Sequence, residues 1–142
     1  YYNKFTSGNI NNALLRKFFT AIAMAKGFLL NMPKFIVDYR KYYHNFVTPK
    51  EVQEEVIPQI VPGWDHSPRS SERAVIYTNN TPEYFEKHCE EALNAIKDKK
   101  HKIAILKSWN EWGEGNYMEP DLVYGRGFIS ALNRAINKIF KG

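Results

Sequence analysis

Apolar residues along the chain follow two periodicities, one typical of helices and one typical of strands. Three segments repeat apolar side chains every three to four positions, which predicts amphipathic helices. They are residues 11–30, 81–97 and 127–140. Four short runs are rich in β-branched and aromatic residues, which favours strands. They are residues 35–39, 56–61, 74–77 and 102–108. Strands that alternate with helices indicate βαβ units and a parallel sheet, so we expect an α/β fold.

The second of these helices carries a clear start signal. Thr81, Pro82 and Glu83 supply a hydroxyl at the N-cap, a proline at the first helical position and an acid in the first turn. The apolar face of this helix contains Cys89, the only cysteine of the chain, which we expect to be a buried, inert thiol. The basic run at 97–102 that follows the helix is interpreted as a solvated connection.

The run at 102–108 leads into the segment that carries the most chemistry. Its centre is apolar on both faces, as expected for a strand buried in a parallel sheet. Residues 108–120 then read Ser-Trp-Asn-Glu-Trp-Gly-Glu-Gly-Asn-Tyr-Met-Glu-Pro. Loops at the C-terminal ends of the strands form the active sites of (β/α) barrels. Glu111 and Glu114 therefore lie where catalytic groups are expected.

The two glutamates have the chemistry that cleavage of a glycosidic bond needs. One carboxyl group protonates the leaving oxygen and a second handles the charge that develops at the anomeric carbon, with a separation of about 5 Å in retaining enzymes. A hydrogen-bonding amide and three flat aromatic rings, all suited to a sugar, lie nearby in the sequence. They are Asn110, Trp109, Trp112 and Tyr117. From the residues alone, a solvated loop with core tryptophans stays an open alternative.

Composition and charge argue against several other classes of protein. With 44% hydrophobic and 25% charged residues, the 142-residue chain has the balance of an ordinary globular domain. Its net charge of +5 comes from scattered lysines and arginines, so we expect no nucleic-acid partner. Its apolar stretches are shorter than a membrane span requires. The lone cysteine favours a reducing compartment, and no residues have metal-ligand spacing, so we expect no metal and no cofactor.

The order of residues in the acidic loop resembles a known family. Residues 109–115, Trp-Asn-Glu-Trp-Gly-Glu-Gly, and Met-Glu-Pro-Asp at 118–121 are similar to the glycosyltransferase WbsX family. Through it they resemble the endo-α-mannosidase family of glycoside hydrolases. A second block agrees, with Pro-Gly-Trp-Asp at 62–65 followed by Arg69. This chain has His66-Ser67 where the family usually has Asn-Thr.

The resemblance implies a fold and roles for individual residues. The fold is the C-terminal portion of a (β/α)8 TIM-type barrel, incomplete in the single domain of residues 1–142, because eight βα units need about 250 residues. An N-terminal barrel half is the expected partner of this portion. Glu111 is implied as the base that acts on the 2-hydroxyl of the sugar, and Glu114 as the acid that acts on the leaving oxygen. The substrate-binding residues expected around the pair are Trp64, Asp65, Arg69, Trp109, Asn110, Trp112, Tyr117 and Glu119.

Two functions of different class follow as hypotheses. The first is a bacterial cytoplasmic enzyme that cleaves or transfers glycosidic bonds of a polysaccharide or oligosaccharide in surface polysaccharide metabolism, with hydrolase and transferase both open. The second is a non-catalytic carbohydrate-binding or structural fragment, because half a barrel need not hold two carboxylates rigidly. For Asp65 and Arg69, an ion pair that only fixes their loop is the alternative to substrate binding.

Overall fold

The computed structural model describes residues 17–18, 21–22, 25, 29 and 35–141. The helix predicted at 11–30 therefore lies largely outside the described residues, although those described within it are helical. The first half of the remaining chain consists of short elements. They are β1 (Phe35–Asp38), α3 (Tyr39–Tyr42), the 3-10 turns η1 (Tyr43–Asn45) and η2 (Pro49–Val52), β2 (Gln59–Ile60), α4 (Ser67–Ser70), η3 (Ser71–Arg73) and β3 (Val75–Thr78).

The second half contains the two long helices and the hairpin that carries the acidic loop. Its elements are α5 (Pro82–Ile96), β4 (Ile105–Leu106), β5 (Asn110–Glu111), η4 (Trp112–Glu114), β6 (Asn116–Tyr117) and α6 (Gly127–Phe140). The helix predicted at 127–140 has the same bounds as α6. The helix predicted at 81–97 begins one residue later, at Pro82, and ends one residue earlier, at Ile96. Pro82 opens α5 as expected, but the Thr81 side chain makes no capping hydrogen bond.

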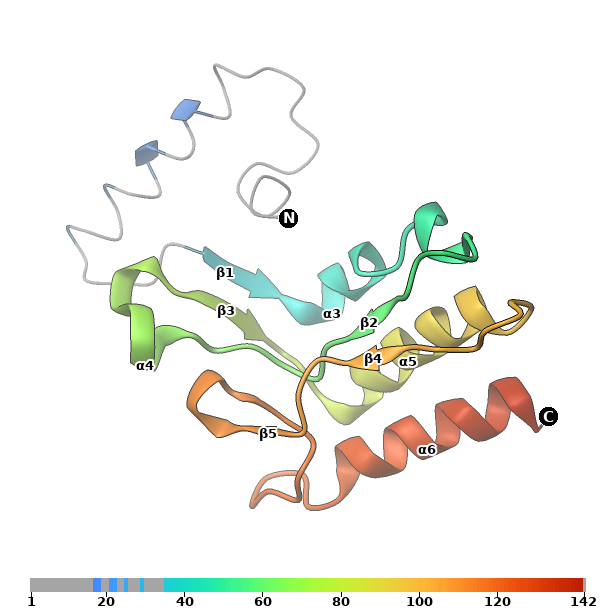
Figure 1. Cartoon of the computed structure of the whole chain (residues 1–142). Helices are drawn as coiled ribbons and strands as arrows, with labels where there is room; N and C mark the ends of the chain where they lie inside the picture. Colours follow the sequence, from blue (N-terminus) through green and yellow to red (C-terminus); the bar gives the residue numbers. More distant parts are fainter. Residues whose placement is uncertain (1–16, 19–20, 23–24, 26–28, 30–34, 142) are drawn as a thin grey trace.

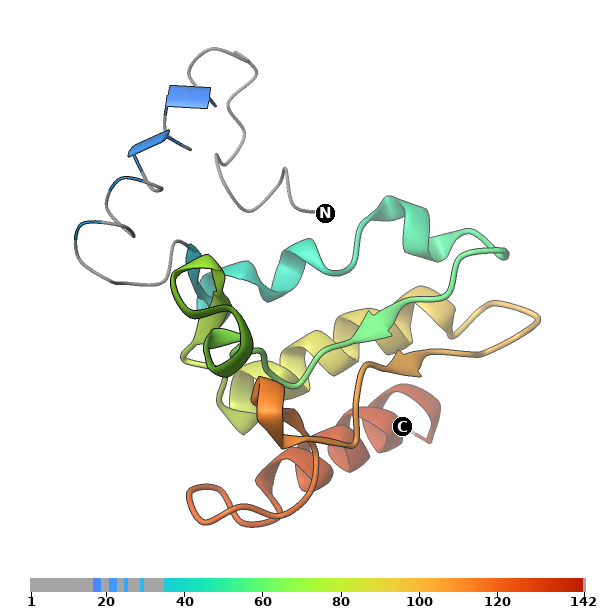
Figure 2. The same cartoon turned by 60° about the vertical axis from the view of Figure 1, so that its left-hand side comes forward.

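Strand pairing among the described residues confirms an α/β fold. β1 pairs with β3 and β2 pairs with β4, both in parallel, while β5 and β6 form an antiparallel hairpin. Along the chain, β2 is followed by an inserted segment that contains α4 and β3, and then by α5, β4, the hairpin and α6. The helices α5 and α6 lie side by side next to the β2–β4 pair (Figures 1 and 2). This part of the chain therefore consists of two successive βα units.

The main core lies where α5 and α6 face each other and the inner side of β2 and β4. Its fully or nearly fully buried residues come from β2, α5, α6 and the segment after β6, while Leu106 of β4 packs against them partly buried. The buried residues are Ile60, Phe85, Cys89, Ala92, Leu93, Ile96, Met118, Phe128, Ala131 and Ala135. Cys89 is buried here as predicted, and burial raises the pKa of its thiol.

A second, aromatic cluster connects the start of the described chain to the end of β2. Tyr39, Tyr43, Phe46 and Val61 are its buried members. The Tyr39 hydroxyl donates a hydrogen bond of 2.8 Å to the backbone carbonyl of Val61. From α5, the buried His88 accepts at Nε2 from the backbone N–H of Val61 at 3.2 Å. Two buried side chains therefore hold the backbone at the position where β2 leads into its loop.

The segment predicted as a strand at 102–108 is shorter and more exposed than expected. Only Ile105–Leu106 form a strand, and exposure alternates along the run. The side chains of Ile103 and Ile105 remain 52% and 48% exposed, whereas Ala104 and Leu106 pack against the core. The expectation of burial on both faces is therefore wrong for the described chain, because α5 and α6 cover only one face.

The basic run at 97–102 is also not uniformly solvated. Lys99 is 7% exposed, and its ammonium group donates to the backbone carbonyls of Gln53 and Val56, each at 2.6 Å. This side chain joins the end of α5 to the segment that precedes β2. The prediction of a solvated connection is wrong at this position, because the ammonium group is held by two backbone carbonyls, one of which also accepts from the Val56 N–H.

Helices formed by the described residues are all too short or too polar to cross a membrane.

Replacing Lys99 should destabilise the chain. Lys99→Met keeps the apolar stem but removes the ammonium hydrogen bonds to both carbonyls, although that of Gln53 keeps the Val56 N–H, so we expect the free energy of unfolding to fall by about 2 kcal/mol, measured by urea unfolding. Lys100→Met is the matched control, because Lys100 is exposed, and it should stay within about 0.5 kcal/mol of the parent. Equal losses in the two variants would contradict a structural role for the Lys99 ammonium.

His88 should make stability depend on pH. Burial lowers the pKa of His88 from 6.5 to about 4, with the Gln59 backbone acting in the opposite direction. The unfolded chain therefore takes up a proton between these values while the folded chain does not. The contribution is complete above pH 6.5 and is lost as the pH falls toward 4.

The measurement compares urea unfolding at pH 7 and pH 4.5 for the parent and for His88→Gln, which keeps a hydrogen-bond acceptor. The parent should lose about 2–3 kcal/mol more than the variant over this interval. Carboxylates that titrate in the same range contribute equally to both proteins and cancel. Identical pH profiles would show that the pKa of His88 is the same in the folded and the unfolded chain.

Candidate functional site

The loops that follow β2 and β4 meet at one end of the paired strands. The backbone N–H of Asp65 donates to the carbonyl of Glu114 at 2.7 Å, which connects the two loops directly. Gly115 allows this approach, because it adopts a φ of +55° and a Cβ there would lie 3.0 Å from the Cβ of Asp65. The structure therefore places Trp64 and Asp65 on the same rim as Glu111 and Glu114.

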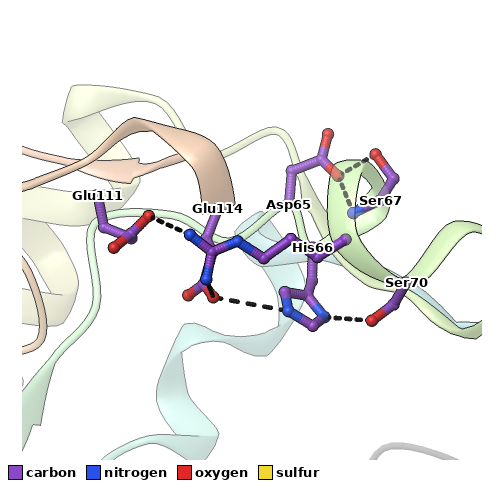
Figure 3. Close-up of polar contacts among 7 residues, drawn as sticks. Asp65, His66, Ser67, Ser70, Glu111 and Glu114 are labelled. Atoms are coloured by element: carbon purple, nitrogen blue, oxygen red, sulfur yellow. Dashed lines mark hydrogen bonds and ion pairs between the residues drawn. The ribbon is translucent and has the colours of Figure 1, made fainter.

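Arg69 joins the two glutamates through a single guanidinium group. Its Nη2 lies 3.1 Å from Oε1 of Glu111, and its Nη1 lies 3.1 Å from Oε1 of Glu114 (Figure 3). The side chain of Glu114 is 15% exposed, against 41% for Glu111 and 55% for Arg69. Ion pairs this close to solvent contribute little to stability. The main consequence of the arrangement is geometric, since both carboxyl groups are held toward one point.

Gly113 provides the space for this ion pair. A Cβ at residue 113 would lie 3.3 Å from Oε1 of Glu111 and 3.5 Å from Nη2 of Arg69. A side chain at residue 113 would crowd both partners of the ion pair. This explains why a glycine stands between the two glutamates of the motif.

The loop after β2 is fixed by contacts other than an Asp65–Arg69 ion pair, which the sequence left open as an alternative to substrate binding. Oδ1 of Asp65 accepts from the backbone N–H of Ser67 at 2.9 Å and from its hydroxyl at 2.5 Å. His66 lies with Nε2 3.5 Å from Oε1 of Glu114 and with Nδ1 2.8 Å from the hydroxyl of Ser70 (Figure 3). The alternative in which an Asp65–Arg69 ion pair fixes the loop is wrong, because Arg69 binds the glutamates instead.

Trp112 forms an aromatic platform next to the glutamates. Its ring stacks on that of Tyr117 with centroids 3.8 Å apart and an interplanar angle of 12°. Its indole Nε1 donates to Oε2 of Glu119 at 2.7 Å. The residue is still 48% exposed. Tyr117 therefore covers one face of Trp112, Glu119 fixes its orientation, and the rest of the ring is open to solvent.

The other predicted binding residues are placed less uniformly. Trp64 has the ring of His66 stacked at 5.8 Å and the ammonium group of Lys107 at 4.5 Å from its centroid. His66 and Lys107 therefore cover part of the Trp64 ring. Trp109 is 51% exposed, and Asn110 is exposed on the same loop.

Three residues of this site were missed from the sequence, because none of them belongs to a motif. Lys107 contacts Trp64 and Ser70 contacts His66. The hairpin register places the buried Asn116 across from Glu111. Within the described residues, no group of three or more His, Cys, Asp or Glu side chains is placed to hold a metal ion.

Comparisons with known proteins identify relatives at the sequence level. Over 106 residues, 72% of this chain, it is 26% identical to the uncharacterized protein WxcX of Xanthomonas campestris pv. campestris strain ATCC 33913. Over 84 residues, 57% of this chain, it is 30% identical to the protein of the same name from strain B100. These matches cover only 15% and 12% of the two relatives' own lengths. No solved structure matches the chain.

The family comparison covers most of the chain, including both loops of the site. The profile described as "Glycosyltransferase WbsX" matches residues 3–132, and the chain therefore belongs to the glycosyltransferase WbsX family.

Proposed function

We propose that this chain carries the acid and base of an enzyme that cleaves or transfers glycosidic bonds of a saccharide. The observation that supports this most directly is the Glu111–Arg69–Glu114 bridge at the C-terminal end of the β2–β4 pair. Two carboxyl groups held toward one point are what glycosidic chemistry requires. Membership of a glycosyltransferase family supports a saccharide as substrate.

The proposed reaction uses the two glutamates in the order that the motif implies. Glu111 accepts the proton of the 2-hydroxyl as that oxygen attacks the anomeric carbon, and Glu114 gives its proton to the leaving oxygen as the glycosidic bond breaks. In the second half, the incoming hydroxyl oxygen attacks the anomeric carbon while Glu114 takes its proton, the bond between the anomeric carbon and the 2-oxygen breaks, and Glu111 returns a proton to the 2-oxygen. Water as the incoming group gives hydrolysis, and a sugar hydroxyl gives transfer. Both carboxyl groups thus recover their starting state.

Arg69 and His66 prepare this pair in the free site. Arg69 contacts one oxygen of each glutamate and so holds the two carboxyl groups near each other, and its exposure leaves it able to turn toward a bound saccharide. His66, fixed by Ser70, approaches Glu114 from the side opposite the hairpin loop. We assign both side chains to orientation of the acids and contact with substrate hydroxyls, not to proton transfer.

Trp112 is the proposed stacking surface for one sugar ring. Sugar rings present apolar C–H faces that pack on aromatic rings. Tyr117 and Glu119 hold the indole from behind and from the edge. This geometry changes the roles proposed for these two residues: they act on the substrate through Trp112.

The wider context of the activity is proposed from the fold and the family. The order β2, α5, β4, α6 with parallel strands and adjacent helices supports the C-terminal part of a (β/α)8 barrel. Strand ends from other parts of such a barrel complete the substrate site. We place the reaction in bacterial surface polysaccharide metabolism, in the cytoplasm. Glycosidic bonds of α-mannose type are the first to test, because of the resemblance to endo-α-mannosidases.

Removing either carboxylate should abolish most turnover. Glu111→Gln and Glu114→Gln preserve shape, so each should lower kcat by at least about a hundredfold in the full-length gene product. The assay follows reducing ends released from α-mannooligosaccharides and from extracted bacterial surface polysaccharide. It also follows transfer of labelled sugar to these acceptors. Glu83→Gln is the control, because Glu83 pairs with Lys87 on the surface of α5 and should retain parental activity. Full activity in either site variant would remove that residue from the mechanism.

Loss of the aromatic platform should weaken binding. Trp112→Ala removes the stacking surface while both glutamates remain, so glycan affinity should fall by about tenfold, as for the loss of 1–1.5 kcal/mol of aromatic contact. Calorimetric titration with the same oligosaccharides measures it. Ile57→Ala is the control, because Ile57 is 46% exposed and precedes β2, at the opposite end of the strands. Unchanged affinity for Trp112→Ala would place the sugar elsewhere.

A further inference from the structure

The antiparallel hairpin places Asn116 directly across from Glu111. The register of β5 and β6 pairs Glu111 with Asn116 and Asn110 with Tyr117. Side chains of directly opposite residues share one face of such a pair, with Cβ atoms about 4.5–5.5 Å apart. The side chain of Asn116 therefore starts beside that of Glu111, on the same face of the hairpin.

Asn116 is buried in an unusual state for an amide. Its exposed fraction is 0%, and neither Nδ2 nor Oδ1 has a hydrogen-bond partner among the described residues. Within the part of the chain that the structure describes, it is the only residue with a buried donor and a buried acceptor that both lack a partner. Buried amides are nearly always hydrogen-bonded, so an unpaired one beside an active carboxylate calls for a functional explanation.

Among the described residues, the Glu111 carboxylate has one oxygen that lacks a hydrogen-bond donor, whereas Asn116 has a donor that lacks an acceptor. Arg69 occupies its Oε1 at 3.1 Å, and no described group hydrogen-bonds to Oε2. A base must have a lone pair free to accept the proton of the substrate, and it must also be held in place. The present pairing with Arg69 holds the carboxylate but occupies one of its two oxygens.

We propose that Asn116 is a positioning residue for Glu111, which takes over from Arg69 when a saccharide binds. The Nδ2–H of Asn116 then donates to Oε2 of Glu111, and Arg69 turns toward substrate hydroxyls, which frees Oε1. The exchange keeps the carboxylate in place and makes it available as a base. This inference rests on the proposed function of Glu111, since it assigns the group that orients that residue.

The exchange can be tested on this chain without substrate. Arg69→Met removes the guanidinium, and Arg69 is 55% exposed in the parent, so the fold should persist. We expect the side-chain amide proton of Asn116, observed in a ¹⁵N–¹H correlation spectrum, to move downfield in Arg69→Met. Adding Glu111→Gln should reverse the shift, whereas adding Glu114→Gln, the matched control, should leave it. A signal that does not respond to Arg69→Met, or that responds equally to both glutamine changes, would overturn the proposal.

A second variant separates positioning from a structural role. Asn116→Leu is nearly the same shape and removes a buried amide without partners, so the midpoint of thermal unfolding should rise. In the full-length gene product, kcat should fall by about ten- to a hundredfold with KM unchanged, the scale of a misplaced catalytic group. The double variant with Glu111→Gln should be no slower than Glu111→Gln alone. A lower midpoint, or losses that add in the double variant, would show a structural role.

The two levels of proposal fail in different ways. If Glu111→Gln has full activity, the proposed function of Glu111 is wrong, whatever the amide signal of Asn116 does. If Glu111→Gln is inactive while the signal of Asn116 ignores Arg69→Met, the proposed function stands and the positioning role of Asn116 is wrong.

Discussion

One backbone hydrogen bond, from the N–H of Asp65 to the carbonyl of Glu114, holds together everything that makes this site. It joins two loops that follow different strands and are separated by the whole of α5. Gly115 makes the approach possible through its left-handed backbone and missing side chain. Because the loops touch here, Arg69 from one can reach both glutamates of the other, and His66 can approach Glu114.

This contact depends in turn on the packing beneath it. α5 and α6 cover the inner side of β2 and β4 and fix where the two strands end. Tyr39 and His88 hold the backbone of Val61 just before the loop begins. Buried apolar contacts therefore determine the position of the strand ends, and polar contacts of modest strength arrange the side chains above them. A loop built this way can change its ion pairs without cost to the core.

Local signals in the sequence predicted the elements that depend on local physics. Apolar periodicity and Pro82 located α5 and α6 to within a residue, and the acidic motif located both glutamates. The long-range partners could not be predicted from the sequence. Glu111 and Glu114 lie 42 and 45 residues from Arg69 along the chain, and no sequence pattern indicates that these side chains meet. Burial was misjudged at Ile105 and at Lys99, because it depends on which face a neighbour covers and on which backbone carbonyls lie within reach of a side chain.

The two long helices also carry a matched set of charges on their surface. Glu86 pairs with Arg134 and Glu90 with Lys138, so both pairs have the same sequence offset and the same one-turn spacing. A slip of α6 by one helical turn would break both pairs and allow only one new pair to form. The two ion pairs thus favour one alignment of α5 and α6. Salt that screens these exposed pairs would remove this preference, while the buried contacts between the two helices would keep them aligned.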